Sequence, residues 1–244
     1  RNGAGGGSLS FAAGDLNGDG VTDLVVVDGT GSVVERLGIG DGSFGPARTI
    51  RVEACEDYYC YPVTAVIDVN ADGFADVVLW NEVLLGHGDG TFAEPVAGGA
   101  RGLLVDVDGD GYLDNIDGGF DVRLGGADGI FAGGLAFASG GSCGGIASAD
   151  LNADGAPDFV CAIAPNWGDG SGDSADRVSV ALNVGDAAFA MPRVLPAPEA
   201  PLVVAAADVN GDGRIDLLTA GQCSQIGRPS CDGTAALSIW LAAP

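Results

Sequence analysis

A nine-residue motif rich in aspartate, D-x-[DN]-x-D-G-x-x-D, occurs five times in this sequence, at Asp15–Asp23, Asp68–Asp76, Asp106–Asp114, Asp150–Asp158 and Asp208–Asp216. Calcium prefers about six to eight oxygen ligands, and a short loop supplies them when alternate side chains turn inward and a glycine allows a sharp bend. The motif has oxygen-bearing side chains at positions 1, 3, 5 and 9 and a glycine at position 6. It therefore predicts up to five Ca²⁺ sites.

The expected ligands follow from these positions. In the first copy Asp15, Asn17, Asp19 and Asp23 offer side-chain oxygens, and Val21 offers its backbone carbonyl. The equivalent residues in the other copies are Asp68, Asn70, Asp72, Phe74 and Asp76; Asp106, Asp108, Asp110, Tyr112 and Asp114; Asp150, Asn152, Asp154, Ala156 and Asp158; and Asp208, Asn210, Asp212, Arg214 and Asp216. Asp108 replaces the asparagine of the other copies and adds charge to the third loop.

Three other interpretations of the motif are possible: an EF-hand, a Mg²⁺ site and turns that bind no metal. An EF-hand needs an acid at position 12, and only the third copy has one there, Asp117. Mg²⁺ demands a near-ideal octahedron and retains its waters, so it fits this donor set less well. Asp, Asn and Gly are also common turn formers without a metal. Five copies with the same ligand positions favour calcium over simple turns.

Short apolar runs on both sides of each motif predict strand, loop, strand, as in Phe11–Gly14 and Leu24–Val27. Gly/Asp-rich segments further along predict a second hairpin turn in each unit: Gly38–Phe44, Gly86–Phe92, Gly125–Phe131 and Asn183–Phe189. Repeated units of about four antiparallel strands predict an all-β propeller, here one domain over residues 1–244 with five blades of three to four strands. The repeats are expected near residues 10–50, 63–100, 101–140, 143–195 and 202–244, with 1–9 a candidate for closing the last blade.

The Asp motifs, the Gly-x-Gly-Asp-Gly-x-Phe turns and Phe44-Gly45-Pro46 resemble the FG-GAP/VCBS repeat family, seen in integrin α-chain propellers and in secreted microbial proteins that include lectins. The resemblance covers nearly the whole chain. It implies a calcium-stabilised β-propeller that serves as a platform for adhesion or ligand binding, with catalysis in only some members.

Composition narrows the range of partners. With 10 basic and 34 acidic residues the chain carries a formal charge of −24, which disfavours nucleic acid and anionic membrane surfaces as partners. No apolar run approaches the roughly 18 residues of a membrane helix, so membrane insertion is not expected. Six cysteines, and a first residue that is not methionine, indicate a processed protein that is secreted, extracellular, periplasmic or on the cell surface.

The cysteines predict three local bridges. Cys143 and Cys161 lie across one strand–loop–strand hairpin, so we expect them to pair. Cys55 with Cys60, and Cys223 with Cys231, would each clamp one long loop.

Strand alternation places the long loops on the face opposite the Asp motifs. These loops carry Tyr58, Tyr59, Tyr61, Trp167, Gln225 and Arg228, a candidate binding set for a glycan or an extracellular protein. The same aromatic residues suit packing over the blade ends, and this alternative stays open. Trp80 and Trp240 are expected in the core, and His87 in a turn.

A binding module of lectin or adhesion type is the favoured function. The single histidine lies on the calcium face, and there is no lysine for a Schiff base. The alternative is a carbohydrate-active enzyme, a polysaccharide lyase or glycosidase, that uses carboxylates or tyrosine on the same scaffold. A third option is an adhesion or spacer domain of a longer polypeptide.

Overall fold

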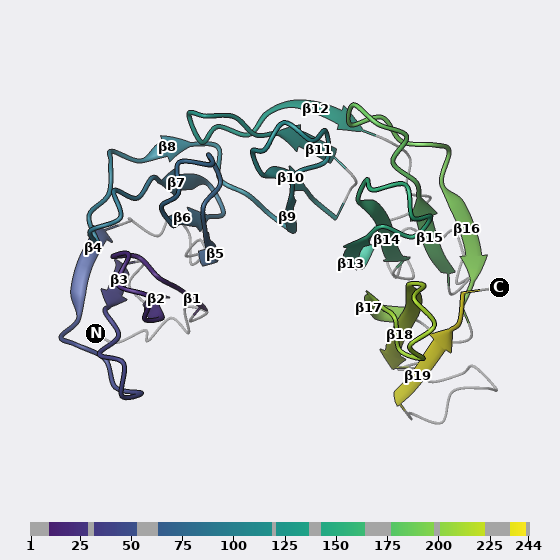
Figure 1. Ribbon diagram of the computed structural model, residues 1–244, viewed down its shortest axis with the longest axis horizontal. Coiled ribbons are helices and arrows are strands. Elements are labelled where there is room, and N and C mark those ends of the chain that lie inside the picture. The colour runs from purple at the N-terminus through teal and green to yellow at the C-terminus, as the bar shows by residue number, and fades with distance from the viewer. Residues whose placement is uncertain are drawn as a thin grey trace, which may run out of the picture. The chain divides into compact units, whose positions relative to one another are not determined.

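The fold consists of β-strands joined by turns and loops (Figure 1). The computed structural model describes residues 10–28, 32–52, 63–118, 121–136, 143–163, 177–197, 201–222 and 235–242. Within these ranges every regular element is a strand, and no helix is present that is long and apolar enough to cross a membrane.

The described strands form five antiparallel sheets, each built from strands that follow one another in the chain. The first contains β1 (Ser10–Gly14), β2 (Asp23–Val27), β3 (Ser32–Arg36) and β4 (Arg48–Val52). The second contains β5 (Val63–Ile67), β6 (Asp76–Leu79), β7 (Glu82–Leu84) and β8 (Val96–Ala97). The third contains β9 (Leu103–Val105), β10 (Asp114–Ile116), β11 (Asp121–Leu124) and β12 (Ala132–Ala136).

The last two sheets follow the same order. The fourth contains β13 (Cys143–Ala149), β14 (Asp158–Ile163), β15 (Arg177–Ala181) and β16 (Arg193–Pro196). The fifth has three described strands, β17 (Pro201–Ala207), β18 (Asp216–Gln222) and β19 (Ala235–Trp240). Consecutive four-stranded antiparallel order is that of a propeller blade, so the predicted all-β fold with blade-like sheets of three to four strands is confirmed.

The Asp motifs join the first and second strands of each sheet, as predicted. In the first sheet the last paired residues before the loop are Gly14 and Asp23, and the first strand runs back from there to Ser10, opposite Val27. The predicted second turns are bounded by isolated bridges between Gly38 and Phe44, Gly86 and Phe92, and Asn183 and Phe189. His87 lies in one of these turns, as expected, and its Nδ1 is 3.1 Å from Oγ1 of Thr91.

The chain divides into two compact units, and each has its own core. The first unit contains residues 1–101, 111–113 and 124–132, and the second contains 102–110, 114–123 and 133–244. In the first unit β1 packs beside β5, and in the second β13 packs beside β17. β-Branched residues that alternate along the second strands supply these cores, as in β2, where Asp23, Val25 and Val27 are buried and the residues between them are half-buried.

The buried cores lie between neighbouring sheets of each unit. In the first unit the cluster consists of Leu16, Val25, Val27, Val33, Val77, Leu79 and Leu84. In the second a cluster consists of Val160, Ala162, Val178 and Val204. β6 and β14 are buried along their whole length, because residues on both of their faces contact other parts of the protein.

Candidate metal centres

The first aspartate of each Asp motif is held by backbone amides of its own loop. Oδ1 of Asp15 accepts hydrogen bonds from the amides of Gly18 (2.8 Å) and Asp19 (3.2 Å), and Oδ2 accepts one from Gly20 (2.8 Å). These bonds, that from Gly20 above all, hold the pKa of Asp15 below its usual value. Asp208 in the fifth loop has the same arrangement and the same direction of shift. Both side chains are therefore ionised at neutral pH.

Positions 3 and 5 are coupled to each other within the loop. Nδ2 of Asn17 donates to Oδ2 of Asp19 at 2.9 Å, and Oδ1 of Asp19 accepts from the amide of Val21 at 2.8 Å. The same amide–carboxylate bond recurs in the second, fourth and fifth loops, between Asn70 and Asp72, Asn152 and Asp154, and Asn210 and Asp212. The loop thus fixes several side-chain oxygens within one tight bend.

Left-handed backbone at two positions makes this bend. Position 6 is glycine in every loop, with φ of 80° at Gly20 and 88° at Gly73. Position 4 is left-handed as well, but it is alanine in two loops, with φ of 56° at Ala71 and 60° at Ala153. A Cβ in this region is strained, so the two alanines store conformational energy.

Glycine is expected to relieve this strain. Ala71→Gly and Ala153→Gly should each raise the free energy of unfolding by about 0.5–1 kcal/mol, because the loss of αL strain exceeds the added entropy of the unfolded chain. Gly211→Ala, at the same position of the fifth loop where an added Cβ meets open space, should lower it by a similar amount. Urea unfolding at one fixed calcium concentration measures all three, and a destabilised Ala71→Gly variant would contradict the explanation.

The aspartate at position 9 differs from the others because it accepts a hydrogen bond from a residue outside its own loop. It is fully buried, and its two oxygens join the Asp loop to the second turn of the same sheet. Oδ2 of Asp23 accepts from the amide of Leu16 at 2.8 Å, and Oδ1 accepts from the amide of Gly38 at 2.7 Å. We refer to this pair of bonds as the aspartate clasp. It places the Asp loops and the second turns at the same edge of a sheet, as the sequence predicted.

The clasp recurs in other sheets. Asp76 accepts from Val69 (2.9 Å) and Gly86 (2.8 Å), and Asp158 accepts from Leu151 (2.8 Å) and Asn183 (2.8 Å). Asp216 accepts from Val209 and from Ala242, two residues beyond the end of the last described strand. Burial raises the pKa of Asp76 to about 6, and it raises that of Asp158 too, although the amide bonds oppose the shift.

The third loop brings three carboxylates closest together. Ligand atoms of Asp106, Asp108 and Asp114 all lie within 4.8 Å of one another, and this is the one such group that the described part of the chain contains. The extra carboxylate of Asp108 replaces the asparagine of the other loops. Three carboxylates at this spacing repel one another unless a cation or protons compensate them.

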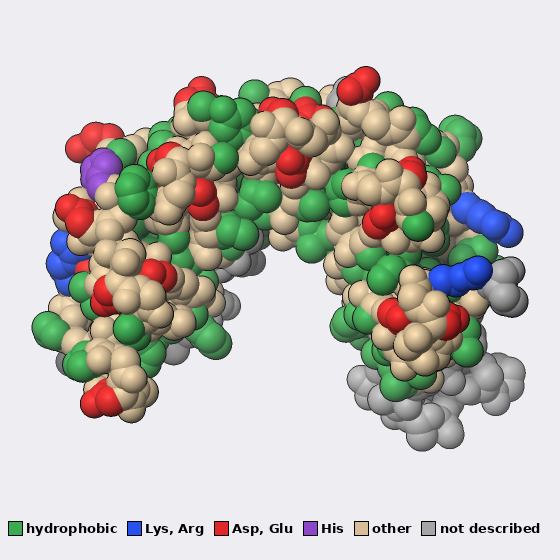
Figure 2. Space-filling model, in the orientation of Figure 1, with side chains coloured by type: hydrophobic (Ala, Val, Ile, Leu, Met, Phe, Trp, Pro, Cys, Tyr) green, Lys and Arg blue, Asp and Glu red, His purple; other side chains and the backbone are tan. Residues whose placement is uncertain are grey.

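The donor set fits a hard cation. Every side chain at positions 1, 3, 5 and 9 presents oxygen, each carboxylate oxygen has lone pairs for more than one interaction, and the ionised Asp15 and Asp208 carry full charge. Acidic side chains recur along the face seen in Figure 2. The loops are thus chemically suited to Ca²⁺ through positions 1, 3, 5 and 9, because a clasp carboxylate that accepts backbone amides still has lone pairs for a cation.

Of the other predicted residues, the structure describes only some. Cys143 and Cys161 form a disulfide, as predicted, between β13 and β14. Trp80 is half-buried, with the guanidinium of Arg101 4.2 Å from its ring centroid. The candidate binding set and the other predicted bridges lie outside the described residues: Tyr58, Tyr59, Tyr61, Trp167, Gln225, Arg228, Cys55, Cys60, Cys223 and Cys231.

One feature was missed by the sequence analysis, a pair of arginines on β4 that reach the second sheet. Arg51 donates to both carboxylate oxygens of Glu82, at 2.8 and 2.9 Å. Arg48 donates to Glu35 at 2.5 Å and to the carbonyl of Gly90. Glu35 and Glu82 stand in apolar strands and are buried, and a buried carboxylate in such a strand is the sequence signal for a cationic partner.

Comparison with known proteins finds one matching family and two similar solved structures. The sequence matches the profile of the FG-GAP-like repeat over residues 15–79 and 150–219. No curated protein matches it. The structure is similar to that of the V. cholerae biofilm matrix protein Bap1, with a TM-score of 0.50 and 15% identity over 89% of this chain and 35% of that chain. It is also similar to BBS1N in complex with ARL6DN, with a TM-score of 0.39 and 14% identity over 89% of this chain and 76% of that one.

Proposed function

Because the chain belongs to the FG-GAP-like repeat family, we propose that it is an extracellular binding module whose sheets are stabilised by Ca²⁺ and which recognises a glycan or a protein surface. The observation that carries the proposal is the fivefold Asp loop, with carboxylates fixed by backbone amides. The likeness to Bap1 concerns the fold, and the present chain spans 35% of that structure.

In this proposal the metal has a structural role. Ca²⁺ would be held by side-chain oxygens at positions 1, 3, 5 and 9, with the carbonyl at position 7, and it would compensate the charge that these loops concentrate. The aspartate clasp anchors the first, second and fourth loops to the second turns of their sheets, so a loop ordered by the metal would also order that edge of the sheet. The binding surface is thereby held on a rigid scaffold.

The disulfide supports an extracellular location, and the proposed calcium sites and the net charge agree with it. Cys143 and Cys161 form a disulfide. Disulfides persist in oxidising compartments and are rare in the reducing cytosol. Calcium sites of modest affinity fill outside the cell, where calcium is abundant, rather than in the cytosol. The formal charge of −24 fits the same setting, because it keeps the protein soluble and disfavours nucleic-acid partners.

Native mass spectrometry and a glycan array test the proposal. The protein should bind up to five Ca²⁺ ions, and glycan binding should weaken after chelation with EGTA. Asp15→Ala together with Asp19→Ala should remove one bound ion without abolishing the others, because the loops lie in separate sheets. Absence of bound calcium at millimolar concentration, with the protein folded, would refute the metal part of the proposal.

A further inference from the structure

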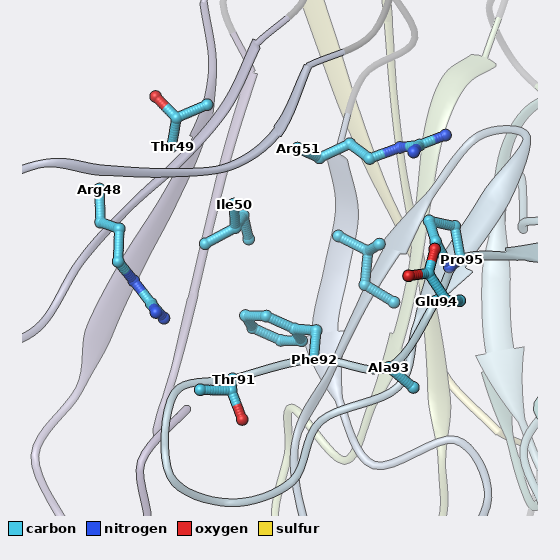
Figure 3. Close-up of a pocket in the computed structure, with 10 residues that line it drawn as sticks. Arg48, Thr49, Ile50, Arg51, Thr91, Phe92, Ala93, Glu94 and Pro95 are labelled. Carbon is cyan, nitrogen blue, oxygen red and sulfur yellow. The ribbon is translucent and has the colours of Figure 1, made fainter.

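A groove lies between the first and second sheets, outside the Asp loops (Figure 3). It has a volume of about 340 Å³, within the usual range for small-ligand sites. One wall is β4, from Arg48 to Arg51, and the other is the segment Thr91–Pro95 that follows the second turn of the second sheet. We name it the inter-sheet groove.

Apolar side chains support the middle of the groove, while polar groups make up most of its accessible lining. Leu84 is 2% exposed and belongs to the core cluster, and Ile50 and Phe92 pack against the same cluster. Figure 3 shows the Phe92 ring facing Ile50 across the middle of the groove. A ring held in this way offers a flat apolar surface that needs no ordering when a ligand binds.

Polar groups stand on both sides of this apolar middle. Figure 3 shows Arg48 on one side of Phe92, and Arg51 with Glu94 on the other. Arg48 is positioned by Glu35 and by the carbonyl of Gly90, and Arg51 is held by two bonds to Glu82. Both guanidinium groups are thus fixed before any ligand arrives, and an arginine has five N–H donors in all.

The charged residues in and around the groove indicate the net charge of the ligand that it can bind. Glu35 balances Arg48, and Glu82 balances Arg51. Glu94 remains, and among the residues that the structure describes it makes no ion pair. With a formal charge of −24 on the whole chain, the groove does not favour an anion. A neutral molecule that carries both hydrogen-bond donors and acceptors fits this balance.

From these contacts we infer that the inter-sheet groove binds a neutral pyranose unit of a glycan. The apolar face of the sugar ring lies against Phe92, its hydroxyls donate to the carboxylate of Glu94, and they accept from Arg48 and Arg51. A pyranose has this division between one C–H face and a rim of hydroxyls, and it matches an apolar middle with polar ends. This inference rests on the proposed binding function and names its ligand class and its site.

Saturation-transfer NMR on the calcium-loaded protein tests the inference. The probes are the methyl glycosides of galactose, glucose, mannose, fucose and N-acetylglucosamine, with those of glucuronic acid and N-acetylneuraminic acid as the anionic arm. At least one neutral glycoside is expected to bind, and to bind more tightly than either anionic probe. Tighter binding of an anionic probe, or binding of none of the neutral ones, would overturn the inference.

Variants then locate the binding. Glu94→Gln removes a charged acceptor and Phe92→Leu removes the flat ring, and each should weaken binding of the neutral glycoside about tenfold. Phe44→Leu is the matched control, because Phe44 occupies the same bridge position in the first sheet and lies outside the groove. It should leave the affinity unchanged. Glu94→Gln alters an exposed rim side chain, so it keeps the test open if Phe92→Leu fails to fold.

The outcomes separate this inference from the broader proposal. If the glycan array shows a bound glycan and neither Glu94→Gln nor Phe92→Leu weakens that binding, the inter-sheet groove is not the binding site, while the proposed binding function is retained. If neither the array nor the glycosides show binding while calcium is bound, the glycan ligand fails for both. Loss of neutral glycoside binding in Glu94→Gln, with unchanged melting temperature, supports the groove.

Discussion

Replacing Asp76 with asparagine is expected to lower the free energy of unfolding by about 3 kcal/mol, even with calcium removed. Both oxygens of the buried carboxylate accept backbone amides, one from Val69 in the Asp loop and one from Gly86 in the second turn. Asparagine keeps one acceptor, and its NH₂ group then faces the other amide. That amide and the new NH₂ group are then two buried donors that face each other without an acceptor, which is the costly case for a hydrogen bond.

Asp72→Asn in the same loop is the matched control. Asp72 is exposed, and the asparagine oxygen still accepts the amide of Phe74. Its cost should stay below about 1 kcal/mol. Urea unfolding in EGTA measures both variants free of any effect on metal binding. Equal losses in Asp76→Asn and Asp72→Asn would show that the clasp does not stabilise the sheet.

The clasp explains why the motif continues to position 9 although the tight bend ends earlier. Positions 1, 3 and 5 are held by short-range bonds within the loop. Position 9 instead reaches a turn 10 residues away for Asp76 and 25 away for Asp158. A loop anchored in this way has a fixed place on the sheet edge.

Local patterns were enough to predict much of the fold. The strands on both sides of each Asp motif, the bridge-bounded turns such as Gly38–Phe44, and the Cys143–Cys161 bridge all depend on residues close in sequence. Strand alternation alone placed the Asp loops and the second turns at one edge. Antiparallel neighbours in the chain are neighbours in the sheet, so these features follow from spacing.

Contacts between sheets were not predictable in the same way. Asp23 was expected to close a metal cage, and its carboxylate also binds Gly38, 15 residues along the chain. Arg51 meets Glu82 over a separation of 31 residues, and Arg48 meets Gly90 over 42. No spacing rule gives such partners, because the bond of Asp23 depends on how two turns of one sheet meet and the bonds of the arginines depend on how neighbouring sheets pack. Glu35 in β3 and Glu82 in β7, carboxylates within apolar strands, were the available signals.

Removing calcium with EGTA is expected to lower the melting temperature by at least about 10 °C, on the proposal that several loops bind the ion. A ligand present at a hundredfold its dissociation constant stabilises the folded state by about 2.7 kcal/mol per site. Chelation also exposes the repulsion between carboxylates that each loop holds together. Differential scanning calorimetry in calcium and in EGTA measures the gap, and identical curves would contradict calcium binding.

The Asp108→Asn variant distinguishes the effect of carboxylate repulsion on the melting temperature from the effect of losing the metal. Asp108 lies within 4.8 Å of Asp106 and Asp114, and asparagine restores the pattern of the other four loops. In EGTA the variant should melt above the wild type, because one repelling carboxylate is gone. In calcium it should lose that advantage, because a neutral oxygen attracts the cation less. The calcium-dependent gap therefore shrinks, and a variant with an unchanged gap would remove the third loop from the set of calcium sites.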